Sequence, residues 1–70
     1  MDIQLMFGIR CRELRKKTGM SQEKFASSIE MDRTYYASIE IGKRNVSLKN
    51  IQKIAKGFGV SLCELFEGVI

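Results

Sequence analysis

Seventy residues are enough for one small domain, and a composition of 44% apolar and 29% charged residues is typical of a folded globular protein. No apolar run approaches the roughly 18 residues of a membrane span and no signal peptide is visible, so we expect no membrane contact and, with two unpaired cysteines, a cytoplasmic location. Histidine, paired-cysteine motifs and glycine-rich phosphate loops are absent, so we expect no metal, cofactor, small-molecule ligand or catalysis. The net charge of +4 favours a polyanionic partner.

Residues that favour helix ends divide the chain into five predicted helices. The predicted ranges are about 5–18, 22–29, 33–41, 48–57 and 61 onward. All but the first follow a candidate N-cap, and these caps are Ser21, Asp32, Ser47 and Ser61. Glu64, three residues after Ser61, completes a capping box. Because strand-like alternation is missing, the predicted fold class is all-α, with a single domain over residues 1–70.

Apolar residues recur in each predicted helix at the spacing of one buried face. In the first helix these positions are Ile3, Phe7, Cys11, Leu14 and Thr18. Cys11 is therefore interpreted as a small buried hydrophobe, with a reactive thiol as the alternative. The later helices are predicted to bury Phe25, Ala26, Ile29, Tyr36, Ile39, Leu48, Ile51, Ile54 and Ala55.

The second and third helices are separated by only three residues, 30–32, which is typical of a DNA-binding helix-turn-helix over residues 22–41. Ala26 is small where the two helices must approach closely. The outward face of the third helix offers Arg33, Thr34, Ala37 and Ser38, with Tyr35 at its edge. A polar, short-chained face headed by an arginine suits insertion into a major groove.

The segments Ser21-Gln22-Glu23-Lys24-Phe25-Ala26 and Ile39-Glu40-Ile41-Gly42-Lys43-Arg44 resemble those of the lambda-repressor-like (Cro/cI, or XRE) regulators. The resemblance covers about residues 6–66 and implies the compact five-helix fold of that family, with a third helix that reads bases. Within the family, Asp32-Arg33-Thr34-Tyr35 and Arg44-Asn45 are most similar to the controller proteins of restriction–modification systems. Such proteins are small dimers that bind operators upstream of their own gene and the endonuclease gene. One departure is Glu30, because many members have glycine at this left-handed position of the turn.

These features assign candidate contacts to double-stranded DNA. Arg33 is the candidate for a bidentate contact to guanine, with a phosphate contact as the alternative. The full set predicted for base readout is Arg33, Thr34, Ser38 and Arg44. The set predicted for the DNA backbone is Gln22, Tyr35, Lys43, Asn45 and Lys49. Gln22 opens the second helix, where free amides favour a phosphate, and the resemblance implies that its side chain clamps the backbone. The resemblance also implies a structural ion pair between Arg15 and Glu40.

A homodimer is expected because one helix that touches a few base pairs cannot select a site within a genome, whereas a two-fold dimer on a pseudo-palindrome can. The predicted dimerisation segment is 58–70, with an interface formed by Phe58, Val60, Leu62, Leu65 and Phe66. Alternatively, these residues close the core of a monomer. The alternative function is an antitoxin-like or other protein-binding module of the same fold, although 70 residues leave little room for a neutralising segment.

Overall fold

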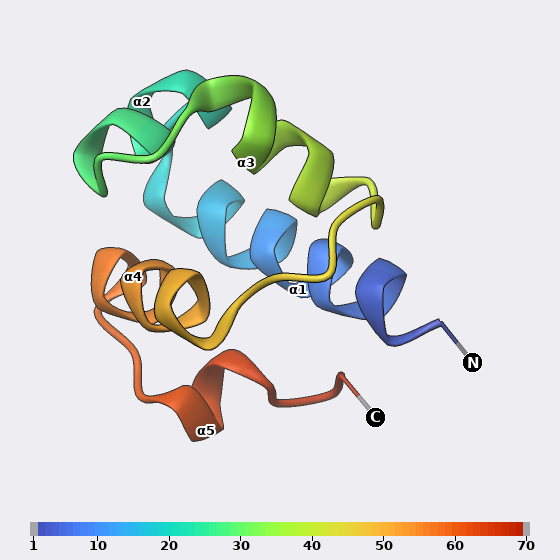
Figure 1. Cartoon of the computed structure of the whole chain (residues 1–70). Coiled ribbons are helices and arrows are strands. Elements are labelled where there is room, and N and C mark those ends of the chain that lie inside the picture. Colours follow the sequence, from blue (N-terminus) through green and yellow to red (C-terminus); the bar gives the residue numbers. More distant parts are fainter. Residues whose placement is uncertain (1, 70) are drawn as a thin grey trace.

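The structure is a computed structural model that describes residues 2–69. These residues form five helices and no strand, as shown in Figure 1: α1 (Ile3–Thr18), α2 (Gln22–Ser28), α3 (Arg33–Glu40), α4 (Leu48–Phe58) and α5 (Leu62–Leu65). The predicted all-α, five-helix fold is therefore confirmed. Among the described residues, none of the helices is both long and apolar enough to cross a membrane.

Short polar side chains fix the beginning of every helix. Asp2, Ser21, Asp32, Ser47 and Ser61 each accept a hydrogen bond from a backbone amide of the first turn. α1 begins two residues earlier than predicted because the Asp2 carboxylate accepts the Gln4 amide at 3.0 Å. The predicted capping box of α5 is present, since the Ser61 and Glu64 side chains each bind the other's backbone amide.

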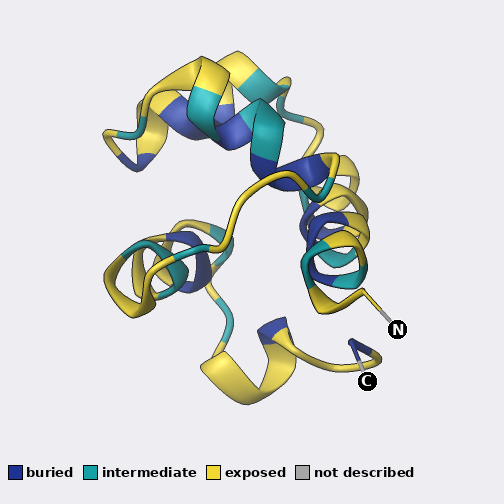
Figure 2. Cartoon of the chain, turned by 45° about the vertical axis from the view of Figure 1, so that its right-hand side comes forward, coloured by how far each residue is buried: buried dark blue, intermediate teal, exposed yellow. Residues whose placement is uncertain are grey.

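α1 packs against α3 and α4, and α2 packs against α3 (Figure 1). Glycine allows two of the closest approaches in the core. A Cβ atom on Gly8 would overlap the carbonyl oxygen of Ile39 in α3, and one on Gly57 would overlap the side chain of Ile29. Figure 2 shows the buried faces of the helices turned toward one another. The buried apolar residues are Phe7, Cys11, Leu14, Phe25, Ala26, Ile29, Tyr36, Ile39, Ile54, Ala55, Leu65 and Val69.

The interior of this core confirms the interpretation of Cys11. Its side chain is fully buried, and burial raises the pKa of the thiol to about 12, so it is not a reactive thiolate. Beside it, the Phe25 ring stacks on Phe58 with ring centroids 4.1 Å apart and meets Tyr36 at 5.1 Å. Stacked and tilted aromatic rings of this kind add to the hydrophobic stabilisation of a small core.

Three positions predicted to be buried are exposed: Ile3, Thr18 and Leu48. Ile3 and Thr18 are the first and last residues of α1, and Leu48 is the first residue of α4. All three therefore lie at the end of a helix, where fewer neighbouring residues cover a side chain. Leu48 is 83% exposed and reaches the same surface groove as Ile51, Leu62 and Phe66.

The C-terminal segment is divided between the core and the surface. Leu65 is fully buried within one protomer, so its predicted place in a dimer interface is wrong. Leu65 faces the core because α5 is held against α1. The guanidinium of Arg10 on α1 donates hydrogen bonds to the carbonyl oxygens of Glu64 and Leu65. Phe58 and Val60 also pack on the core, whereas Leu62 and Phe66 remain exposed. Ile70, the end of the predicted dimerisation segment, lies outside the described residues.

Candidate DNA-binding surface

The turn between α2 and α3 has the geometry expected of a helix-turn-helix. Glu30 adopts the left-handed conformation, with φ of 54°, as expected for a position at which glycine is common. The next amide, that of Met31, donates to the carbonyl oxygen of Ala26 at 2.9 Å and closes the turn. Ala26 itself is fully buried, so a larger side chain would separate the two helices.

A buried ion pair fastens this unit to α1. Arg15 binds Glu40 with both ends of its guanidinium, through Nε to Oε2 at 2.7 Å and Nη2 to Oε1 at 3.1 Å. The side chains are 14% and 2% exposed, so the predicted ion pair is present and largely removed from water. Burial alone would raise the pKa of Glu40, but the hydrogen bonds from Arg15 and Gln22 outweigh it and lower that pKa.

Gln22 takes part in the same network. Its side-chain amide donates to Glu40 Oε1 at 2.9 Å, at the beginning of α2. This bond orients the Gln22 side chain at the N-terminus of α2, where the sequence analysis predicts a contact with a DNA phosphate. The network of Arg15, Gln22 and Glu40, here called the Arg15 cluster, joins α1, α2 and α3.

The beginning of α3 presents Arg33 and Thr34 to solvent. The Arg33 guanidinium lies 3.7 Å from the Glu23 carboxylate on α2, and both side chains are about 70% exposed (67% and 71%). An ion pair this exposed contributes little energy and readily exchanges its partners. Arg33 is therefore free to leave Glu23 for another acceptor at the same surface.

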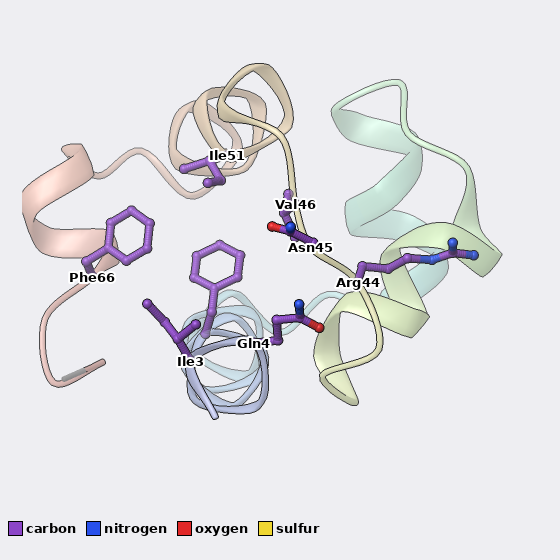
Figure 3. Close-up of a pocket in the computed structure, with 8 residues that line it drawn as sticks. Ile3, Gln4, Arg44, Asn45, Val46, Ile51 and Phe66 are labelled. Atoms are coloured by element: carbon purple, nitrogen blue, oxygen red, sulfur yellow. The ribbon is translucent and has the colours of Figure 1, made fainter. Parts of the chain in front are cut away.

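The loop after α3 places three further predicted contacts beside Arg33's helix. Gly42, with φ of 80°, turns the chain back next to α1, and Lys43, Arg44 and Asn45 are all exposed. Arg44 extends from the loop over α3 and away from the apolar side chains behind the loop (Figure 3). Its Nε donates to Ser38 Oγ at 2.8 Å, and its guanidinium carbon lies 5.3 Å from the centre of the Tyr35 ring.

Asn50 on α4 is a member of this surface that the sequence analysis missed. Its side-chain amide donates to the Tyr35 hydroxyl at 3.2 Å. Asparagine in the first turn of a helix is common, so the sequence carries no signal for this bond. Lys49, the neighbouring residue and a predicted backbone contact, is exposed.

Behind the loop is a small cavity of about 110 Å³, whose lining residues are drawn in Figure 3: Ile3, Gln4, Phe7, Arg44, Asn45, Val46, Ile51 and Phe66. Binding pockets for small molecules usually measure roughly 300–1,000 Å³. Nor do the described residues contain a cluster of three or more histidine, cysteine or acidic side chains that could hold a metal ion.

The sequence matches a family model described as helix-turn-helix over residues 12–65. It is also 56% identical to control protein C.MunI from a Mycoplasma species, over 97% of this chain and 93% of that protein. The chain belongs to the helix-turn-helix family. The predicted resemblance is thereby confirmed, and the family is one of DNA-binding transcription regulators rather than enzymes.

Solved helix-turn-helix structures agree with this assignment. The restriction–modification controller protein C.AhdI from Aeromonas hydrophila is 46% identical, with a TM-score of 0.87 over 90% of this chain and 96% of that one. The controller protein C.Esp1396I, solved as a tetramer in complex with its natural 35-base-pair operator, is 32% identical. Its TM-score is 0.88 over 99% of this chain and 91% of that one. Within the helix-turn-helix family, the chain therefore groups with controller proteins.

Proposed function

We propose that this protein is a restriction–modification controller protein that binds operator DNA through α3 and the loop after it. The observation that carries the proposal is the 56% identity with a control protein over nearly the whole length of both chains. The solved controller–operator complex supports the same function. Arg33 and Thr34 of α3 are exposed, as is Arg44, which contacts Ser38 and Tyr35 of the same helix, so all three side chains are open to DNA. Operator DNA in bacteria lies in the cytoplasm, which is where we infer the protein to act.

The contacts divide by chemistry into two groups. Arg33, Thr34, Ser38 and Arg44 lie on or over α3, where a major groove would receive them, and we assign base readout to them. Gln22, Lys43, Asn45 and Lys49 lie outside α3 and Tyr35 lies on it, and we assign contacts with the DNA backbone to these five residues. Amide, hydroxyl and ammonium groups all fit a phosphate, and the planar fork of an arginine suits the two acceptors of guanine.

We also propose that the protein acts as a homodimer through an exposed apolar patch formed by Leu48, Ile51, Leu62 and Phe66. These four side chains, from α4, α5 and the residue that follows α5, line one groove, and Leu48 and Leu62 are 83% and 52% exposed. So much apolar surface on a small protein marks an interaction site. A second copy is the occupant that the function requires, because two copies of α3 read the two halves of a pseudo-palindrome. The oligomeric state of C.Esp1396I on its operator is in keeping with self-association.

The test of DNA binding uses the duplex upstream of the protein's own gene and a scrambled duplex of equal length. We expect a clear preference for the upstream duplex, with half-sites about one helical turn apart. With about six to ten phosphate contacts, affinity should fall by roughly 10³–10⁵ between 50 and 200 mM salt. Equal affinity for both duplexes, or a flat salt profile, would refute the proposed function.

The test of assembly is sedimentation of Leu62→Glu beside Ile9→Glu. Both substitutions add one negative charge at an apolar side chain that is about half exposed (52% and 50%), but Ile9 lies on α1 outside the patch. We expect Leu62→Glu to be a folded monomer that loses operator preference, and Ile9→Glu to remain a dimer. A wild-type protein that sediments as a monomer at tens of micromolar and on DNA would overturn the dimer, and so would an unchanged Leu62→Glu.

A further inference from the structure

Four polar side chains from three segments meet on the outer face of α3. They are Tyr35 and Ser38 of α3, Arg44 of the following loop and Asn50 of α4, here called the Arg44 cluster. The Ser38 hydroxyl donates to the Tyr35 carbonyl at 2.6 Å, so its oxygen is turned toward the Arg44 Nε, from which it accepts at 2.8 Å. The guanidinium carbon of Arg44 then lies 5.3 Å from the centre of the Tyr35 ring.

These contacts fix Arg44 while its charged end is still open to solvent. The remaining nitrogens, Nη1 and Nη2, have no hydrogen-bond partner among the described residues and can still meet an acceptor. A long arginine side chain loses rotamer freedom when it binds. In this protein Arg44 has already lost part of its rotamer freedom before DNA binds. An acceptor that the held guanidinium can reach is therefore favoured over acceptors placed elsewhere.

The position of Arg44 depends on Tyr35, and the position of Tyr35 depends on Asn50. The Tyr35 ring is half-buried and its hydroxyl is held by the Asn50 amide at 3.2 Å. Asn50 in turn is fixed by the start of α4, where its backbone amide donates to the Ser47 cap at 3.2 Å. The hydrogen bond from Asn50, in the first turn of α4, thus orients the Tyr35 ring against which Arg44 packs.

We propose that Asn50 is a positioning residue for DNA readout, which acts through Tyr35 on Arg44. This inference rests on the proposed function, because it concerns the same DNA-binding surface. The bond is only part-buried, so its loss should cost little stability. Its effect should therefore be on discrimination between sequences rather than on folding.

The experiment first selects a preferred duplex from a random pool with the wild-type protein, and then measures binding to that duplex and to all its single base-pair variants. For Asn50→Ala we expect the discrimination to fall about 3- to 10-fold at one or two base pairs of each half-site, as for the removal of one hydrogen bond. Affinity for a scrambled duplex and the melting temperature should stay unchanged. Lys53→Ala, a change at an exposed position of the same helix outside both the Arg44 cluster and the apolar groove, should keep full discrimination.

The pathway through Arg44 is tested in the Arg44→Ala protein. If Asn50 acts by positioning Arg44, adding Asn50→Ala to Arg44→Ala should cause no further loss of discrimination at the same base pairs. Additive losses, or full discrimination by Asn50→Ala alone, would overturn the inference and leave the proposed function standing. A wild-type protein that selects no preferred duplex would overturn both.

Discussion

The two arginine clusters use similar contacts for opposite purposes. In the Arg15 cluster, an arginine meets a carboxylate that is 2% exposed, and the pair joins α1 to the helix-turn-helix. In the Arg44 cluster, an arginine meets a hydroxyl and an aromatic ring at the surface. Burial makes the difference, because removing one partner of a buried pair leaves a charge without water, whereas the charged end of Arg44 stays in water and can still take an acceptor. The first cluster therefore contributes to stability, and the second is suited to recognition.

The largest effect should come from breaking the Arg15 cluster. Glu40→Ala leaves the largely buried Arg15 guanidinium with no carboxylate, which we expect to lower the free energy of unfolding by about 3–5 kcal/mol. A domain of this size rarely has more than roughly 3–5 kcal/mol in total, so the variant should be largely unfolded at low concentration. Urea denaturation followed by circular dichroism measures this directly.

The matched control is Glu23→Ala, which removes the carboxylate from the exposed pair with Arg33. We expect the free energy of unfolding to fall by less than about 1 kcal/mol. If the two substitutions cost the same, burial does not distinguish the clusters and the comparison fails.

Acid should remove part of the same stabilisation. Because the pKa of Glu40 is lower in the folded protein than in the unfolded chain, the unfolded state binds more protons as the pH falls. The free energy of unfolding should therefore hold above the unfolded-state pKa of about 4.3 and decrease as Glu40 protonates below it. Glu40→Gln carries no titrating group at this position, so its stability should depend less steeply on pH over that range. Parallel profiles for the two proteins would show that Glu40 contributes nothing to acid unfolding.

Local rules predicted most of the fold, because caps and periodicity act within a few residues of each other. Ser21, Asp32 and Ser61 begin helices where the sequence places them, and Glu30 adopts the left-handed conformation expected of the turn. The ion pair of Arg15 with Glu40 spans 25 residues, and only the family resemblance pointed to it. Sequence periodicity describes one helix at a time and cannot reveal such a distant partner.

The wrong placement of Leu65 in the dimer interface and the missed contact of Asn50 have the same physical origin, because both depend on how separate helices pack. Leu65 and Leu62 are equally apolar and lie three residues apart, yet α5 turns the first into the core and the second to solvent. That choice depends on where Arg10 fastens the helix, which is a property of the assembled fold. The bond between Asn50 and Tyr35 likewise joins α4 to α3 and exists only once both helices are placed.

Within the exposed surface, the next largest effect should come from Arg33. Its side chain is 67% exposed and held only by an exposed carboxylate, so Arg33→Ala should not change stability measurably. We expect it to weaken binding to the operator by about 1–3 kcal/mol and to relax preference at one base pair of each half-site. Lys53→Ala, which removes one positive charge from α4, is the control and should keep the preference. If Arg33→Ala lowers binding to operator and random duplexes by the same factor, Arg33 contacts phosphate rather than a base.

The smallest effect should come from Lys43, one residue before Arg44 in the same loop. Its ammonium group is exposed and makes no hydrogen bond or ion pair among the described residues, so it differs from Arg44 in having no fixed direction. A mobile point charge attracts any phosphate but cannot select a base. Lys43→Ala should therefore weaken operator and random duplexes equally and reduce the slope of log affinity against log salt by about 1 for each phosphate that Lys43 neutralises. Fluorescence anisotropy titrations of both duplexes at several salt concentrations measure the slope and the preference together. A change in base preference for Lys43→Ala would mean that readout extends along the loop and does not depend on the fixed side chain of Arg44.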